Sequence, residues 1–206
     1  AGDKLLTTGN PVRAGLLAAR EEVRSPSNPP RVLVVGGSLG AEPLNKLLPE
    51  ALALLDEQLQ VDVRHQCGEQ HVEVTQQRYV DVGVAADVFP FIDDMAAAYA
   101  WADLVICRAG ALTVSELAIM GKASFLVPLP HAIDDHQSKN AEFLAAQGAA
   151  VILPQRDTDA ARLAKHLTEV FMDNQRLTTM GQQARQLAQP QATQQVVDAC
   201  LEVAHG

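Results

Sequence analysis

The stretch LVICRAGALTVSE, residues 104–116, joins a short apolar run to a small-residue turn and the start of a helical pattern. Leu104–Cys107 predicts a buried strand, and a helix is expected to begin at about Thr113. The first turn of a helix has backbone N–H groups without partners and the positive end of the helix dipole, and the small residues 109–111 let a ligand approach closely. We therefore expect an anion site, with the Glu116 carboxylate placed to reach sugar hydroxyls beside a bound phosphate.

Outward from this stretch, apolar runs alternate with helical patterns. This alternation predicts an α/β fold with a parallel sheet and right-handed crossovers. Ligands of such sheets bind beyond the carboxyl ends of the strands. Strands are expected at 32–35, 61–67, 84–89, 104–107, 123–127 and 149–153, and helices at 41–58, 69–80, 93–101, 113–120, 134–146, 157–173, 174–189 and 193–204.

The two ends of the chain differ from its middle. Residues 1–30 are interpreted as an interdomain segment and linker, because residues 25–30 are rich in proline and serine, and residues 31–206 as one domain. The apolar stripes of residues 160–171 and of the final helix are expected to pack in the core. The first residue is not methionine, which suggests a piece of a longer protein.

The composition limits the function classes. With 206 residues, 48% of them hydrophobic, the chain can bury a sizeable core. A net charge of −9 argues against a general nucleic-acid binder. The three cysteines include no CxxC pair, which argues against a disulfide framework or zinc site and favours a reducing cytosol. No signal peptide or transmembrane run is apparent.

A second small-residue turn, GGSLGA at residues 36–41, follows the first expected strand. It is neither the dinucleotide fingerprint GxGxxG nor a P-loop, which disfavours an NAD-binding oxidoreductase. Its backbone can cradle an anion, with the Ser38 hydroxyl as a donor, or it can be a tight turn in which glycine serves packing. Both interpretations stay open.

Each of the other candidate groups also has a plainer explanation. Glu116 can complement the helix dipole alone, and Thr113 and Ser115 can bond locally within their helix. After the third expected strand, Ile92 can offer its backbone N–H and carbonyl to a base, or the loop can simply cover the core. Phe91 lies beside it.

The loop after the fifth expected strand contains amides and histidines. Gln137 and Asn140 share a helix face, and amides suit sugar hydroxyls because they both donate and accept. The plainer alternative is that Asp134 or Asp135 caps the helix and the amides are solvated. His131 and His136 lack metal-ligand spacing, so we expect no metal site.

Five motifs, taken in order, resemble the C-terminal half of the MurG family. They are TGNPVR at 8–13, GGSLGA at 36–41, FIDDM at 91–95, residues 108–116, and HQ at 136–137 with Asn140. The resemblance implies a Rossmann-like parallel sheet with helices on both faces. This would be one half of a GT-B glycosyltransferase, the domain that binds UDP-N-acetylglucosamine. The family transfers N-acetylglucosamine with inversion to undecaprenyl-pyrophosphoryl-N-acetylmuramoyl-pentapeptide (lipid I), forming lipid II for peptidoglycan.

The resemblance also implies roles for individual residues. Arg13 helps to bind the nucleotide, Ser38 contacts the diphosphate, and the Ile92 backbone reads uracil. Glu116 holds the ribose, and Gln137 with Asn140 binds the sugar. The implied substrate-binding set is Arg13, Ser38, Ile92, Ala111, Leu112, Thr113, Val114, Ser115, Glu116, Gln137 and Asn140, with His136 carried over only weakly.

The resemblance places the rest of the machinery outside this chain. The other half of the protein holds the catalytic base, the lipid I site and most of the membrane-docking patch. The full-length protein is expected to be cytoplasmic and to lie on the cytoplasmic face of the bacterial inner membrane. We expect no catalytic residue, metal or cofactor here. Two alternatives stay open: another GT-B enzyme using a different UDP-sugar, and a non-catalytic donor-binding subunit that needs a partner chain.

Overall fold

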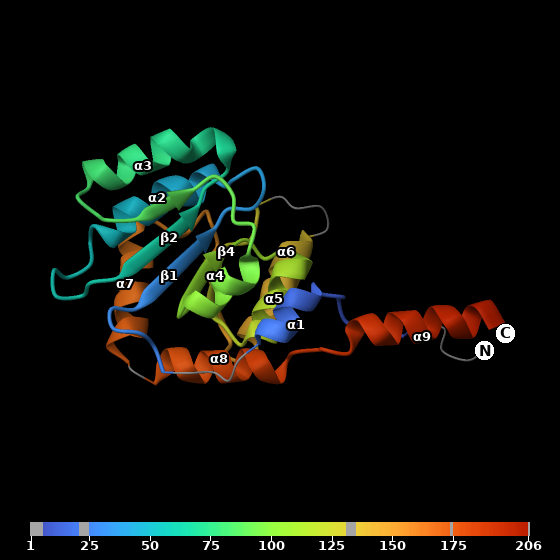
Figure 1. Cartoon of the computed structure of the whole chain (residues 1–206). Coiled ribbons are helices and arrows are strands. Elements are labelled where there is room, and N and C mark those ends of the chain that lie inside the picture. Colours follow the sequence, from blue (N-terminus) through green and yellow to red (C-terminus); the bar gives the residue numbers. More distant parts are fainter. Residues whose placement is uncertain (1–5, 21–24, 131–134, 174, 206) are drawn as a thin grey trace.

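In the computed structural model, six parallel strands form one sheet in the order β3-β2-β1-β4-β5-β6 (Figure 1). The structure describes residues 6–20, 25–130, 135–173 and 175–205. The strands are β1 (Arg31–Val35), β2 (Asp62–Gln66), β3 (Asp87–Phe89), β4 (Leu104–Cys107), β5 (Ala123–Leu126) and β6 (Ala150–Ile152). The helices are α1 (Ala14–Ala19), α2 (Glu42–Leu52), η1 (Glu69–His71), α3 (Val72–Asp81), α4 (Met95–Trp101), α5 (Ala111–Met120), α6 (His136–Ala145), α7 (Ala160–Met172), α8 (Arg176–Gln186) and α9 (Ala192–His205).

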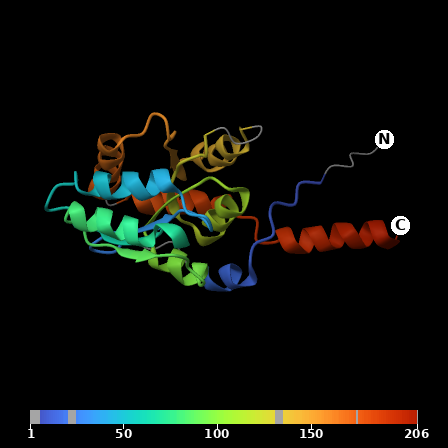
Figure 2. The ribbon, with the colours of Figure 1, turned by 90° about the horizontal axis from the view of Figure 1, so that it is seen from above.

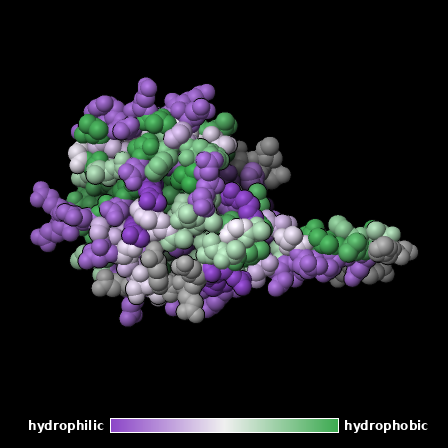
Figure 3. Space-filling view, viewed as in Figure 1, coloured by the Kyte–Doolittle hydropathy of each residue, from purple (hydrophilic) through white to green (hydrophobic). Residues whose placement is uncertain are grey.

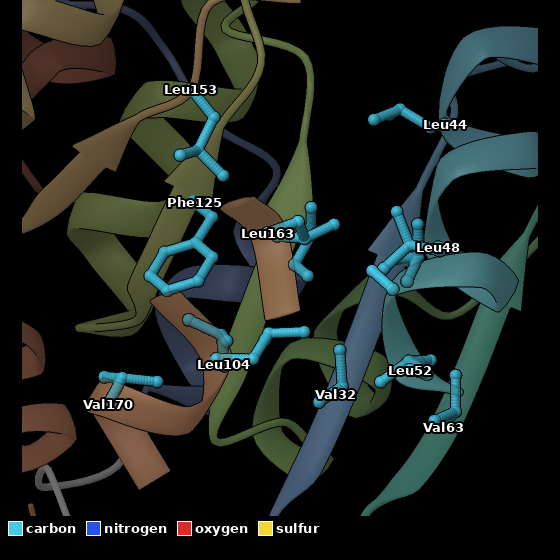
Figure 4. Packing of buried hydrophobic residues seen from close by; sticks show 14 of the residues in the cluster. Val32, Leu44, Leu48, Leu52, Val63, Leu104, Phe125, Leu153, Leu163 and Val170 are labelled. Atoms are coloured by element: carbon cyan, nitrogen blue, oxygen red, sulfur yellow. The ribbon is translucent and has the colours of Figure 1, made fainter. Parts of the chain in front are cut away.

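The central strands are buried on both faces, which explains their continuous apolar runs. Successive side chains point to opposite faces, so Val32 and Val34 of β1 join one core cluster while Leu33 joins the other. The first cluster packs against α2, α3 and α7, and Figure 4 shows side chains of α2, α7 and the strands gathered in it. The second packs against α1, α4, α5 and α6. The predicted Rossmann-like fold with helices on both faces is confirmed.

Several predicted boundaries were wrong. The helix expected to end near Gln58 ends at Leu52, and turns follow in which the Asp56 carboxylate accepts a hydrogen bond from the Gln58 N–H at 2.9 Å. An aspartate that bonds the backbone two residues on favours a turn over a helix. The third strand covers only Asp87–Phe89, because the chain after α3 first turns through Gly83, whose φ is +70°.

The final helix does not pack in the core, contrary to our prediction. Both ribbon views show α9 projecting from the body (Figures 1 and 2). Its apolar side chains Val197, Leu201 and Val203 are exposed, and Figure 3 shows hydrophobic and hydrophilic residues on opposite sides of this helix. An amphipathic pattern thus identified the helix but not what covers it. Within the described residues, no helix is long and apolar enough to cross a membrane.

Two described parts of the segment before residue 31, α1 and the loop that precedes β1, contact the rest of the structure. Leu16 of α1 is buried in the second core cluster, where α1 contacts α4 and α5. The Asp103 carboxylate accepts hydrogen bonds from the backbone N–H groups of Ser27 (3.0 Å) and Arg31 (2.9 Å), which fixes the loop leading into β1.

Candidate functional site

The two small-residue turns meet where the strand order reverses. β1 and β4 are neighbours, and Val35 pairs with Cys107, so Gly36 and Arg108 leave the sheet side by side. Strands added after β1 extend the sheet on one side and those after β4 on the other. Such a switch point leaves a crevice at the carboxyl ends of the strands, the usual ligand position in this fold class.

The start of α5 presents backbone donors at this edge of the sheet. The helix begins at Ala111, two residues earlier than predicted, and Gly110 caps it without a side-chain hydrogen bond. Among the described residues, no acceptor faces the backbone N–H groups of Ala111, Leu112 and Thr113. Both Ala111 and Leu112 are exposed. Free N–H groups and the helix dipole together favour an anion at this position.

The next two residues of α5, Val114 and Ser115, donate hydrogen bonds to carbonyls one turn earlier. The Val114 N–H donates to the Gly110 carbonyl at 2.9 Å, and the Val114 side chain is buried. The Ser115 hydroxyl donates to the Ala111 carbonyl at 3.0 Å and accepts from the Asn10 amide at 3.0 Å. Both residues of the predicted set therefore stabilise the helix and its contact with the N-terminal segment, as the local interpretation of Ser115 expected.

Glycines in the turn after β1 serve two purposes. Gly40 has a φ of +76° and packs against the backbone of Cys67, the residue after β2. A Cβ at position 40 would come 2.0 Å from the Cys67 carbonyl oxygen. Gly36 donates its N–H to the Gln66 carbonyl at 2.9 Å. These two glycines fit the packing interpretation. Gly37, at φ +85° with open space around it, and Ser38 beside it are instead exposed at the crevice.

The side chain of Gln66, which sequence reasoning missed, ties two of the loops together. Its Oε1 accepts from the Gly37 N–H at 3.0 Å, and its Nε2 donates to the carbonyls of Gly37 (2.9 Å) and Pro90 (3.0 Å). The residue is 3% exposed. A polar residue at the carboxyl end of a buried strand was the available signal.

Replacing Gln66 by leucine should destabilise the fold by about 1–3 kcal/mol, because three backbone groups lose their partner. Urea unfolding would measure this, with Gln182→Leu on the exposed face of α8 as a control expected to change stability by less than about 0.5 kcal/mol. Equal losses in both variants would show that the Gln66 amide is not structural.

The turn after β3 contains the residue that caps α4 and an exposed phenylalanine ring. Asp94 caps α4, since its Oδ1 accepts from the Ala97 N–H at 2.9 Å, which resolves the choice between Asp93 and Asp94. The Ile92 side chain packs against the second core cluster, while Phe91 is 57% exposed. Covering of the core therefore explains Ile92 but not Phe91. Among the described residues, no partner bonds the Ile92 backbone groups.

The Glu116 carboxylate is held by two donors. Its Oε1 lies 3.0 Å from Nη2 of Arg13, and its Oε2 accepts from the Tyr99 hydroxyl at 3.0 Å. Arg13 and Glu116, both in the predicted set, are thus brought together, and Tyr99 is a partner that sequence reasoning missed. The Glu116 side chain stays 13% exposed, while burial and the neighbouring carboxylate raise the pKa of Tyr99 well above its usual range.

The two predicted amides of α6 bond to the neighbouring loops. Gln137 Oε1 accepts from the Leu129 N–H at 2.9 Å, and Asn140 Nδ2 donates to the Ala109 carbonyl at 3.0 Å. Both amides are thus held by the protein and are not merely solvated, and within the described ranges no partner bonds the Gln137 amide nitrogen or the Asn140 amide oxygen. His136 is the first residue of α6 and is exposed.

The helix cap expected before α6 is only partly covered by the structure. Asp135 precedes the helix with φ +52°, and its carboxylate accepts from the Ser138 hydroxyl at 2.6 Å instead of from a backbone N–H. The side chain of Asp135 therefore does not cap the helix, which removes one of the two residues named in the plainer alternative. The alternative cap Asp134 and the histidine His131 lie outside the described residues.

The Arg108 side chain donates hydrogen bonds to the loops that follow β5 and β6. Its Nη1 donates to the Val127 carbonyl at 3.1 Å, and its Nη2 donates to Gln155 Oε1 at 2.7 Å. Partial burial lowers the pKa of this guanidinium. Arg108 was quoted in the deciding stretch, but its partners lie 19 and 47 residues away in sequence and could not be inferred.

A comparison with protein-family models matches residues 31–196 to the "Glycosyltransferase family 28 C-terminal domain". This chain belongs to that family. The chain is 64% identical over 203 residues to a Stutzerimonas stutzeri (strain A1501) protein named "UDP-N-acetylglucosamine--N-acetylmuramyl-(pentapeptide) pyrophosphoryl-undecaprenol N-acetylglucosamine transferase", covering 98% of this chain and 57% of that protein. A protein of the same name from Ectopseudomonas mendocina (strain ymp) is 63% identical, covering 100% of this chain and 58% of its own length. The chain thus spans a little over half the length of these relatives.

Solved structures agree with this assignment. The crystal structure of Acinetobacter baumannii MurG superposes on this chain with a TM-score of 0.80 and 49% identity, covering 91% of this chain and 53% of that one. The glycosyltransferase VinC in complex with DTDP has a TM-score of 0.62 at 20% identity, a likeness of fold alone. The predicted resemblance to the MurG family and the predicted GT-B half are confirmed.

Proposed function

We propose that this chain binds the donor in an inverting glycosyltransferase, which moves N-acetylglucosamine from UDP-N-acetylglucosamine to lipid I, forming lipid II. The observation that carries the proposal is the group of three N–H groups at the start of α5 that have no partner among the described residues. They lie beside the exposed Gly37–Ser38 turn and one helical turn from Glu116. The names of the relatives supply the sugar and the acceptor.

In this proposal each part of the donor meets a different loop. The diphosphate lies on the N–H groups of Ala111, Leu112 and Thr113 and near the Ser38 hydroxyl. The ribose contacts Glu116, and the uracil edge meets the Ile92 backbone. The sugar hydroxyls meet the two groups left available on Gln137 and Asn140. Arg13, which is largely exposed, reaches the same region from the segment that we assign to the interdomain connection, residues 1–30.

The chemistry gives the helix start its importance. When the anomeric bond breaks, the leaving UDP gains negative charge, and donors already aimed at the diphosphate stabilise that charge in the transition state. Activation of the acceptor hydroxyl then requires a base on the opposite face of the sugar. We assign that base, the lipid I site and peripheral attachment to the cytoplasmic face of the inner membrane to the other half of the full-length protein.

Calorimetric titration tests the donor site on this chain. UDP and UDP-N-acetylglucosamine should bind saturably at millimolar concentration, with negligible turnover. UDP-galactose and UDP-glucose, titrated in competition, should bind more weakly than UDP-N-acetylglucosamine. No saturable heat with UDP would contradict the donor site, and equal affinities would contradict the assigned sugar.

Glu116→Ala should weaken UDP binding by about 10- to 100-fold, since hydrogen bonds to a charged group contribute about 1.5–3 kcal/mol and each 1.4 kcal/mol is about tenfold. Glu73→Ala, which removes an equal charge from the exposed surface of α3, should leave the affinity unchanged. If both variants bind UDP like the unmodified chain, the ribose role of Glu116 is wrong.

A further inference from the structure

We infer that Tyr99 is a positioning residue for the nucleotide: its buried hydroxyl fixes the Glu116 carboxylate so that both carboxylate oxygens accept from the two vicinal hydroxyls of the ribose. The inference rests on the proposed function and adds to it the residue that sets the preference for a ribonucleotide. It starts from a hydrogen bond between two helices, α4 and α5, which both contribute residues to the second core cluster.

The two partners of Glu116 differ in how firmly they are held. The side chain of Arg13 is 59% exposed, so its pairing resembles a surface ion pair, which side-chain entropy and solvent weaken. Tyr99 is 1% exposed and packed in the core, so its ring cannot change position without disturbing the fold. Tyr99 is therefore the contact that determines the orientation of the carboxylate, and Arg13 is free to exchange toward an arriving diphosphate.

Counting hydrogen-bond capacity shows what the carboxylate has left. An ionised carboxylate has about four acceptor positions on its two oxygens. Arg13 uses one on Oε1 and Tyr99 uses one on Oε2, so one acceptor position remains on each oxygen. A vicinal diol presents two O–H donors at matching spacing, one for each oxygen. The raised pKa of Tyr99 keeps its hydroxyl protonated, so it donates to Glu116 throughout the usual pH range.

This arrangement predicts a preference that depends on the tyrosine hydroxyl. The test measures the affinities of UDP and 2′-deoxy-UDP by calorimetry for the unmodified chain and for Tyr99→Phe, which removes one oxygen and keeps the ring. The unmodified chain should prefer UDP by about tenfold. Tyr99→Phe should bind UDP about 5- to 10-fold more weakly, leave 2′-deoxy-UDP nearly unchanged, and so reduce the preference to about twofold or less.

A matched control separates positioning from general damage to the core. Tyr79→Phe removes the hydroxyl of the other buried tyrosine, which bonds to His65 at 2.9 Å on the opposite face of the sheet. Its stability should fall, but its preference for UDP over 2′-deoxy-UDP should match that of the unmodified chain. A preference that survives in Tyr99→Phe, or that falls equally in Tyr79→Phe, would overturn the positioning role.

A second measurement needs no folded Tyr99 variant. The sequence contains 2 tyrosines, so labelling with 3-fluorotyrosine gives two fluorine signals, which Tyr79→Phe assigns. Saturating UDP should shift the Tyr99 signal more than 2′-deoxy-UDP does and leave the Tyr79 signal in place. An unmoved Tyr99 signal at saturation would overturn the inference, whereas a failure of UDP to bind at all would instead contradict the proposed function.

Discussion

Replacing Gly40 by alanine should lower the free energy of unfolding by about 2–5 kcal/mol, a large share of the about 5–15 kcal/mol typical of a domain. An added Cβ would come 2.0 Å from the Cys67 carbonyl oxygen and 2.9 Å from its carbon. Both atoms belong to the backbone, so the turn itself has to move, which costs about 1–3 kcal/mol, and the left-handed conformation of a residue with a Cβ adds about 1–2 kcal/mol.

The same turn provides a control for the backbone conformation alone. Gly37 has a similar positive φ, +85° against +76° for Gly40, but nothing lies within 4 Å of a Cβ placed there. Gly37→Ala should therefore cost only the conformational part, about 1–2 kcal/mol. Urea unfolding of both variants measures the difference. If Gly37→Ala and Gly40→Ala lose the same stability, the close approach to Cys67 is not what requires glycine at position 40.

Gly40 also illustrates how far local patterns could be carried. The apolar runs of the strands and the turns between them predicted six parallel strands, and the ends of the strands indicated where Ser38, Ile92, Glu116, Gln137 and Asn140 would lie. These inferences needed only neighbours in sequence. That Gly40 lies against the backbone of Cys67 depends on how two loops pack, and a pattern of small residues is compatible with either packing or binding.

Residues that hold the site were missed because their partners are distant in sequence. Tyr99 lies 17 residues from Glu116, and Gln66 lies 24 from Pro90. Each looks locally like an ordinary helix or strand residue. For α9 the local pattern was clear but the missing information was what the helix packs against. An apolar stripe is buried only if another element covers it, and within the described residues Val197 and Leu201 remain exposed.

Behind the turn that contains Gly40 lies a chain of buried polar groups. Asn45 Nδ2 donates to the Cys67 carbonyl at 3.0 Å, so its amide oxygen accepts from Nε2 of His65 at 3.1 Å. The other ring nitrogen, Nδ1, then lacks a proton and accepts from the Tyr79 hydroxyl at 2.9 Å. Neutral His65 satisfies every member of this chain. Burial lowers the pKa of His65 from 6.5 to about 3, so the ring stays neutral in the folded protein.

The folded protein should therefore lose stability as the pH falls from about 6.5 toward 3. In that window the unfolded chain binds a proton at His65 and the folded chain does not, so stability falls with decreasing pH by up to about 1.4 kcal/mol per pH unit from this residue alone. Other groups titrate in the same range, so the effect of His65 is measured by comparing the unmodified chain with a variant that lacks the histidine.

Urea unfolding at pH 6 and pH 4 should show that His65→Gln, which cannot take up this proton, loses about 2–3 kcal/mol less stability than the unmodified chain between the two pH values. His65→Gln should be the less stable protein at pH 7, since glutamine cannot reproduce the geometry of the ring in a packed core. If the stability of both proteins depends on pH in the same way, His65 takes up its proton in the folded state as readily as in the unfolded state. The series of buried hydrogen bonds from Tyr79 to Cys67 would then not support the Gly40 turn in the way its distances indicate.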